Sequence, residues 1–123
     1  MDGKIIKLFE PVTSYDRRYE EIVLREPRGE LLMRLGQPRI PVTNFSAGSG
    51  YYVEPENVIK DYLVALIVIE NDDGTIPYAE GLLKKLSLAD SLQLREALFG
   101  FFDLGAQRIA AKRQDSSVSA SIS

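Results

Sequence analysis

The segment from Pro55 to Ile69 constrains the fold most, because it is apolar on nearly all sides when it is wound as a helix. Pro55 suits the first helical position, and Glu56 places a negative charge in the first turn, where the helix dipole favours it. A helix of this kind is buried, so the other elements must surround it. A buried strand over Tyr62 to Ile69 is the alternative, since Val and Ile are frequent there.

The chain has 123 residues, of which 45% are apolar. A chain of this length forms one domain and buries roughly two-thirds of the surface that its unfolded form exposes. We expect a single domain over residues 1–113, with a β-hairpin at 4–25 and a helical part at 28–112. Residues 114–123 contain five serines and little that a core could use, which predicts a disordered tail.

The first 25 residues read as two strands. Apolar and charged residues alternate on both sides of the polar stretch from Ser14 to Arg18, which suits a hairpin loop of about four to five residues. Pro11 cannot donate a hydrogen bond to a β-ladder. The first strand is therefore expected to be an edge strand or to end near this residue.

A short helix is predicted from Arg28 to Leu35, because Gly36 and Pro38 after it are typical helix terminators. Residues 37–53 are rich in Pro, Ser and Gly, but they also hold large apolar side chains, namely Ile40, Val42, Phe45, Tyr51, Tyr52 and Val53. This segment is either a loop packed onto the core or a second small hairpin that turns at Ser46 to Gly50.

Two more helices are expected, one from Pro77 to Leu86 and one from Leu88 to about Lys112. Ser87 and Asp90 have the spacing of a capping box at the start of the second of these. The chain is thus predicted to have an α+β, mainly α fold, in which an N-terminal β-hairpin is followed by a small bundle of about four helices.

The last predicted helix carries one apolar stripe formed by Leu88, Leu92, Phe99, Phe102, Ala106 and Ile109, which is widened by Leu94, Leu98 and Phe101. Gly100 and Gly105 interrupt it and predict a kink or the close approach of another backbone. Three of the five phenylalanines lie at positions 99, 101 and 102. Their rings either fill the core or reach a partner, since aromatic anchors dominate interface energetics.

The sequence contains no Cys, no His and no Trp. Disulfides, thiolate nucleophiles, Ser-His and Cys-His pairs, and zinc sites built on Cys or His are therefore excluded. Adjacent carboxylates such as Glu20 and Glu21 point to opposite faces of a strand, so they form no acid–base pair. We expect a protein that is not an enzyme and binds neither a metal nor a cofactor.

The formal net charge of −3 disfavours binding to nucleic-acid phosphates. The longest apolar run, Leu63 to Ile69, has seven residues and is too short to span a membrane. The first twenty residues lack the apolar region of a signal peptide. We therefore expect a soluble, cytoplasmic protein with neither nucleic acid nor a membrane as a partner.

Two sets of short motifs resemble a known family. The first is the predicted hairpin leading into Leu24-Arg25-Glu26-Pro27, then Gly29, Leu31 or Leu32, and Leu35-Gly36-Gln37-Pro38. The second is Leu86-Ser87-Leu88-Ala89-Asp90, followed by Leu94, Leu98 and Phe101-Phe102. Over about residues 4–103 the chain resembles the phage tail assembly chaperones of contractile-tailed phages and prophages. It departs from them at Glu30, where many members carry Asp, and in the more aromatic segment from Arg39 to Val53.

This resemblance implies a protein that coats the long, apolar tape measure protein and keeps it soluble until tail tube subunits polymerise around it. Its partners would be the tape measure protein and the tail tube protein. It would act in the cytoplasm of the host bacterial cell and be absent from the mature virion. In many relatives a ribosomal frameshift adds a second domain near the end of the chain.

A tape measure helix presents apolar faces that an apolar groove could cover. We assign partner binding, as a hypothesis, to Phe99, Phe101, Phe102 and Tyr62, with Leu31 and Leu35 as a second wall. A generic protein-interaction or adaptor module, such as a secretion-system accessory protein, is the alternative function. Self-association into a homo-oligomer is open in both cases.

Overall fold

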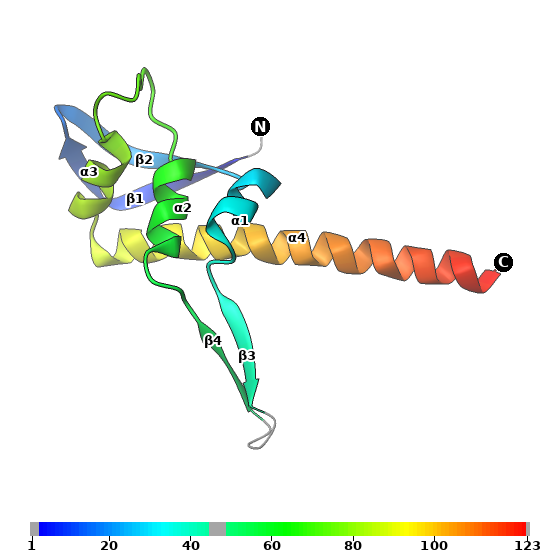
Figure 1. Ribbon diagram of the computed structural model, residues 1–123. Helices are drawn as coiled ribbons and strands as arrows, with labels where there is room; N and C mark the ends of the chain where they lie inside the picture. The colour runs from blue at the N-terminus through cyan, green and yellow to red at the C-terminus, as the bar shows by residue number, and fades with distance from the viewer. Residues whose placement is uncertain (1–2, 45–48, 123) are drawn as a thin grey trace.

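The computed structural model describes residues 3–44 and 49–122, except for the side chains of 44, 49 and 114–122. Within these residues the chain forms two antiparallel hairpins and four helices (Figure 1). In chain order the elements are β1 (Gly3–Ser14), β2 (Arg17–Arg25), α1 (Gly29–Leu35), β3 (Ile40–Asn44), β4 (Ser49–Val53), α2 (Val58–Leu66), α3 (Tyr78–Lys85) and α4 (Leu88–Ile122). The α+β fold with an N-terminal hairpin and four helices is confirmed, and residues 37–53 adopt the hairpin alternative.

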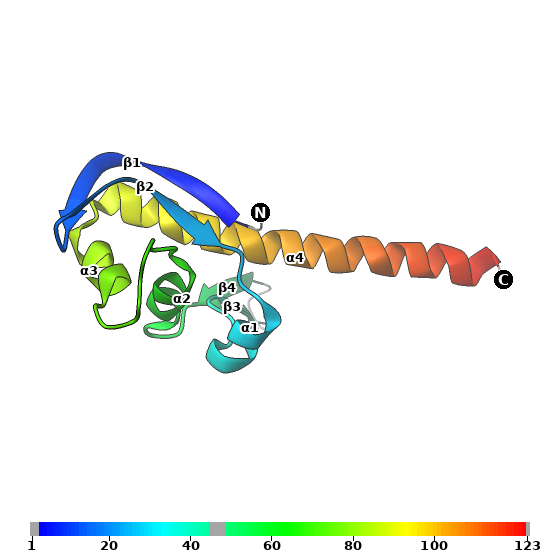
Figure 2. The same ribbon diagram turned by 90° about the horizontal axis from the view of Figure 1, so that it is seen from above.

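Helix α4 runs through the middle of the molecule. The β1–β2 hairpin follows its first half on one side, and α1, α2 and α3 lie on the other side (Figure 2). The second half of α4 extends beyond this body, and its side chains from Ala106 to Arg113 are exposed. The core between these layers consists of Ile6, Ile22, Leu24, Tyr62, Leu63, Leu66, Ile67, Leu82, Leu94, Ala97 and Leu98.

Helix α2 is buried as expected, but it is shorter than the sequence suggests. It covers Val58–Leu66 rather than 55–69, because Asn57 before it has a left-handed φ of 64°. After the helix the chain is extended, and the Val68 N–H donates to the Val23 carbonyl of β2 at 2.9 Å. The alternative of a buried strand is therefore wrong for most of this segment.

The turn between β1 and β2 is tighter than predicted. Ser14 pairs directly with Arg17, so the loop contains only Tyr15 and Asp16. Both loop residues have positive φ, 50° and 62°. This conformation matches the right-handed twist of the flanking strands, which is why two-residue loops of this type are common in hairpins. The expected loop of four to five residues is wrong.

A single buried carboxylate joins β1 to α4. The pairing of β1 with β2 shifts register between Lys7 and Val12. In this irregular stretch the Phe9 N–H donates to Oδ1 of Asp90 at 2.8 Å, and the Glu10 N–H donates to Oδ2 at 3.1 Å. The Asp90 side chain is fully buried. It therefore provides partners for two backbone donors that the irregular pairing turns away from β2.

The same carboxylate organises the start of α4. Oγ of Ser87 accepts from the Asp90 N–H at 3.2 Å, as the capping-box spacing predicts. The Asp90 carboxylate differs from a capping box in that its Oδ2 accepts from the Ser87 hydroxyl, at 3.0 Å. Nε2 of Gln93 donates to Oδ1 of Asp90 at 2.9 Å. Burial alone would raise the pKa of Asp90, but the hydrogen bonds from β1, Ser87 and Gln93 outweigh it and hold this pKa below its usual range.

The buried face of α4 differs from the predicted stripe. Its first half is buried through Asp90, Leu94, Ala97 and Leu98. Leu88 and Leu92, which were expected in the stripe, are 77% and 46% exposed. They lie two positions from Asp90 on either side, about 200° around the helix. Because the Asp90 carboxylate faces β1, these two leucines must point away from the core.

The glycines of α3 and α4 differ in how much space surrounds them. A Cβ added at Gly100 of α4 would meet no other group within 4 Å, and the same holds at Gly105, so the predicted close approach of another backbone is wrong. A Cβ added at Gly81 of α3 would lie 2.5 Å from the ring of Tyr15 and 3.1 Å from Oγ of Ser14. Helix α3 can therefore contact the β1–β2 turn only because residue 81 has no side chain.

Helix α4 continues to Ile122 instead of ending near Lys112. The side chains beyond Arg113 lie outside the described part of the chain. The disordered tail at 114–123, and the boundary of the single domain at residue 113, stay predictions.

We predict that Asp90→Asn lowers the free energy of unfolding by about 2–4 kcal/mol, because an amide has one acceptor oxygen and leaves buried donors without partners. Urea unfolding followed by circular dichroism measures this loss. Glu96→Gln, an exposed change on the same helix, is the control and should stay within about 0.5 kcal/mol of the wild type. A loss at Asp90 as small as in the control would contradict the role of this carboxylate.

The stabilisation by Asp90 should also depend on pH. Its pKa is lower in the folded than in the unfolded chain. The stabilisation is therefore complete above the unfolded pKa of about 3.9 and is lost as the pH falls through the folded value. The difference in stability between the wild type and Asp90→Asn should shrink in acid. A difference that is the same at neutral and at acidic pH would contradict this expectation.

Gly100→Ala is expected to raise the free energy of unfolding by about 1 kcal/mol, because alanine favours the helix and its Cβ meets open space. Gly81→Ala gains the same helix propensity but should lower stability, since its Cβ overlaps the ring of Tyr15. That ring packs edge to face on Tyr78, with centroids 5.5 Å apart, so it cannot move freely. Thermal unfolding compares the two variants. Stabilisation by both would mean that α3 does not contact the turn as described.

Candidate functional site

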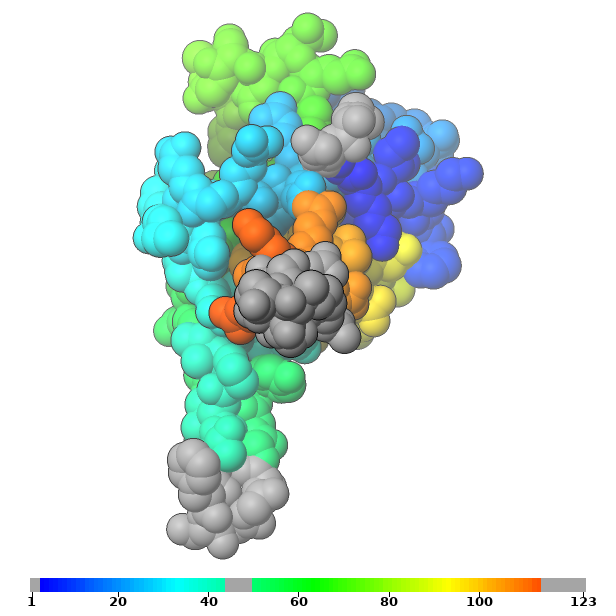
Figure 3. All heavy atoms as spheres, turned by 90° about the vertical axis from the view of Figure 1, so that its right-hand side faces the viewer, coloured from blue at the N-terminus to red at the C-terminus, as the bar shows by residue number. Residues whose placement is uncertain are grey.

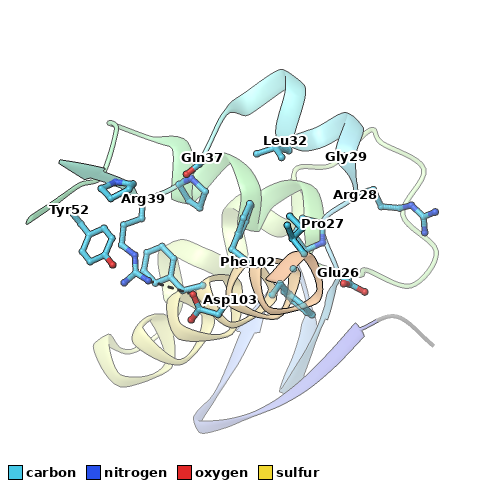
Figure 4. Close-up of a pocket in the computed structure, with 17 residues that line it drawn as sticks. Glu26, Pro27, Arg28, Gly29, Leu32, Gln37, Arg39, Tyr52, Phe102 and Asp103 are labelled. Carbon is cyan, nitrogen blue, oxygen red and sulfur yellow. Dashed lines mark ion pairs between the residues drawn. The ribbon is translucent and has the colours of Figure 1, made fainter. Parts of the chain in front are cut away.

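A groove of about 520 Å³ opens between α4, α1 and the base of the β3–β4 hairpin (Figure 4). Its floor comes from α4, through Phe99, Phe101, Phe102, Asp103, Gly105, Ala106 and Ile109. One wall is formed at the corner between β2 and α1 by Glu26, Pro27, Arg28, Gly29 and Leu32. The other wall is formed by Gln37, Pro38, Arg39, Pro41 and Tyr52. The volume falls within the range of about 300–1,000 Å³ typical of binding clefts.

The walls follow from the way in which the chain leaves α1. Gly36 has φ 79° and ψ −174°, a backbone conformation that is essentially restricted to glycine. Its N–H donates to the Leu32 carbonyl at 2.8 Å and closes the helix. The chain then continues through Pro38 toward α4 and reaches the hairpin. Gly36 therefore sets the direction of the second wall.

The floor is built on a buried aromatic pair. The rings of Phe102 and Tyr62 meet edge to face, with centroids 5.5 Å apart and an interplanar angle of 86°. The Tyr62 hydroxyl donates to the Gly36 carbonyl at 2.5 Å, and burial raises the pKa of this hydroxyl. Tyr62 thus connects the helix end at Gly36 to the floor, and Phe102 lies above it, half-buried.

The base of the hairpin is attached to α4 by Arg39. Its guanidinium carbon lies 4.3 Å from the ring centroid of Phe99 and 4.5 Å from that of Tyr52. A guanidinium nitrogen also lies 4.0 Å from a carboxylate oxygen of Asp103. Cation–π contacts contribute about 0.5–1 kcal/mol each at exposed sites. Arg39 therefore links β4 to the helix through two aromatic rings.

A second ion pair holds the other strand of the hairpin at the same base. Glu54, directly after β4, accepts from Nε of Arg95 at 3.1 Å and also pairs with its Nη2. The hydrogen bond from Arg95 holds the pKa of Glu54 below its usual range. Arg95 in turn lies over the ring of Phe99, 5.0 Å from its centroid. We call Arg39, Glu54, Arg95 and Phe99 the hairpin clamp.

The structure brings together the three predicted phenylalanines, all of which line the groove. Tyr62 is fully buried and supports the floor from below. Leu31 and Leu35 pack against the core, and α1 presents Leu32 to the groove instead. Leu31 and Leu35, which were predicted to form a second wall, do not line the groove. Partner binding by these residues stays a prediction.

Several groove residues carried no signal in the sequence. Arg39 and Tyr52 become part of the site only because the second hairpin folds back to α4. Ile109 was recognised as part of an apolar stripe, and it is now placed at the open end of the floor, 55% exposed. Arg108 beside it pairs with the groove residue Glu26 at 3.8 Å. The long helix thus supplies both apolar and charged contacts to the groove.

The groove is lined mainly by aromatic, aliphatic and proline side chains. Among residues 3–44 and 49–122, no three acidic side chains gather into a candidate metal site. None of the helices described here is long and apolar enough to cross a membrane. Comparisons with family models, with curated proteins and with solved structures found no match.

We predict that Arg39→Ala loosens the hairpin without unfolding the body. Hydrogen exchange should speed up at the amides of β3 and β4, whereas amides of α2 and the first half of α4 should keep their protection. Removing two cation–π contacts and one ion pair accounts for a local loss of about 1–2 kcal/mol. Arg18→Ala, which removes an exposed pair with Glu20 on the other hairpin, is the control. Unchanged exchange in the second hairpin would show that Arg39 does not anchor it.

Proposed function

We propose that this chain is a phage tail assembly chaperone, a non-enzymatic protein that binds the tape measure protein and assists tail tube assembly. The resemblance of its motifs to that family supports the proposal. The motif residues also have defined places in the fold, since Pro27 shapes a groove wall, Asp90 fixes α4, and Phe101 and Phe102 form the groove floor. In this role the protein would act in the host cytoplasm, contact the tail tube protein and be absent from the mature virion.

The groove beside α4 is the observation that carries the proposal. It is lined mainly by aromatic, aliphatic and proline side chains, and its charged residues Glu26, Arg39 and Asp103 each take part in an ion pair. A largely apolar groove of this kind can receive the apolar face of an amphipathic helix. The tape measure protein, as the family resemblance describes it, is a long chain with such faces.

The exposed end of α4 extends the floor. Ile109 is 55% exposed, its neighbours from Ala106 to Arg113 are also exposed, and the second half of α4 extends beyond the body (Figure 1). A helix lying in the groove could therefore continue along α4 and contact more surface than the groove alone offers.

Ile109→Asp is predicted to abolish most of the chaperone effect. A carboxylate in the floor must lose its hydration when an apolar helix binds, so the affinity should fall at least about tenfold. The measurement is the soluble fraction of the tape measure protein on co-expression, followed by co-purification. Both should decrease strongly relative to the wild type.

Leu104→Asp is the matched control, because Leu104 is 50% exposed on the same helix but does not line the groove. It should solubilise the tape measure protein as well as the wild type does. Circular dichroism verifies that both variants are folded. An equal loss in both variants would place the binding site elsewhere on α4, and a wild type that does not solubilise the tape measure protein would contradict the function itself.

A further inference from the structure

The β3–β4 hairpin projects away from the body of the molecule (Figure 3). From Ile40 to Val53 the sequence contains no charged residue. Tyr51 and Tyr52 are 59% and 61% exposed, and the clamp holds the hairpin at its base. A two-stranded hairpin is marginally stable by itself and gains stability from further strands. The hairpin is therefore suited to pair with another chain.

The two hairpins differ in how their edges are protected. Natural proteins place charges on edge strands to prevent pairing between molecules. The first hairpin follows this rule, with Lys4, Lys7, Arg17, Arg18, Glu20, Glu21 and Arg25 on its strands. The second hairpin has none of these charges. Its sequence in β4, Ser-Gly-Tyr-Tyr-Val, also favours strand formation through its aromatic and β-branched residues.

Pro41 blocks one edge of the second hairpin and leaves the other open. Pro41 lies opposite Tyr52. Proline has no N–H, so within an antiparallel pair it fits where its nitrogen faces outward. Because pairs alternate along the ladder, the N–H and C=O groups of Tyr52 and Gly50 then face outward on β4. The edge of β3 lacks a donor at Pro41, whereas the edge of β4 offers both donors and acceptors.

The side chains of this hairpin are divided between its two faces. Alternation along the strands places Ile40, Val42, Tyr51 and Val53 on one face and Pro41 and Tyr52 on the other. The second face carries the residues that line the groove. The first face is apolar at these four positions, and the next pair in the same register toward the tip is Asn44 and Ser49. A sheet extended at β4 would enlarge this apolar face without disturbing the groove.

We propose that β4 pairs in antiparallel orientation with β4 of a second copy of this chain, which joins the two hairpins into one four-stranded sheet. Each copy carries a formal net charge of −3, so two copies approach most easily at the segment that has no charges. An edge that pairs with its own copy also satisfies the two-fold symmetry of most homodimers. Pairing of the whole strand Ser49–Val53 with itself places Tyr51 opposite Tyr51 of the second copy, where two aromatic rings stabilise the pair.

A single cysteine tests this register. The chain has no cysteine of its own, so Tyr51→Cys reports on the contact without background. In the proposed sheet the two residues form a non-hydrogen-bonded pair, whose Cα atoms lie about 4.5 Å apart, within the range of about 4.4–6.8 Å that a disulfide spans. Mild oxidation should convert most of this variant into a covalent dimer. Thr43→Cys, exposed on β3, is the matched control and should stay monomeric on a non-reducing gel.

Sedimentation equilibrium tests the association itself. The unmodified chain should show a reversible monomer–dimer equilibrium. Tyr51→Lys places two ammonium groups opposite each other and should raise the dissociation constant at least about tenfold, whereas Thr43→Lys should change it far less. A chain that is monomeric at all concentrations, equal cross-linking of the two cysteine variants, or a dimer unaffected by Tyr51→Lys would overturn the proposal. Ile109→Asp, which tests the groove, should leave the dimer intact, so the two proposals can fail separately.

Discussion

The buried carboxylate of Asp90 is the contact on which the rest of this structure depends. It joins the first strand to the last helix, across 81 positions of the sequence. It accepts from the Phe9 and Glu10 N–H groups in the stretch where the pairing of β1 with β2 shifts register, and so compensates for the ladder hydrogen bonds lost there. Because its side chain must face β1, it also fixes the rotation of α4. That rotation places Phe102 and Ile109 on the side of α1, where the groove lies.

Local sequence signals were sufficient for most elements of the fold. These signals are the turn residues after α1, the Ser87 cap and the alternation in the first hairpin. Each acts between residues a few positions apart, so it can be recognised in a single sequence. The buried face of α4 could not be predicted in this way, because Leu88 and Leu92 fit an apolar stripe as well as Leu94 does. Only the partner of Asp90, far away in the sequence, decides between these faces. A buried polar residue thus overrides the apolar pattern.

Only part of the candidate site could be predicted, because the rest depends on contacts between residues that are far apart in the sequence. Three phenylalanines within four positions of one helix are visible in the sequence, and they do line one groove. The walls depend on how separate segments pack, and neither Leu32 nor Tyr52 has a local feature that distinguishes it from its neighbours. Arg39 is a further case, because its guanidinium lies over two aromatic rings, Tyr52 of β4 and Phe99 of α4, that are far apart in the sequence. Sequence patterns therefore identify the floor of this site and not its walls.

The groove and the proposed sheet edge meet at one residue, Tyr52. Its ring lines the groove and contacts Arg39, whereas its backbone lies at the outer edge of β4. Tyr51 next to it points to the opposite face, so a helix in the groove and a second copy at β4 require different side chains. Pairing of β4 would also fix Tyr52 and Arg39 in place, which preforms one wall of the groove. Less conformational entropy is then lost when a helix binds, so the two associations should favour each other.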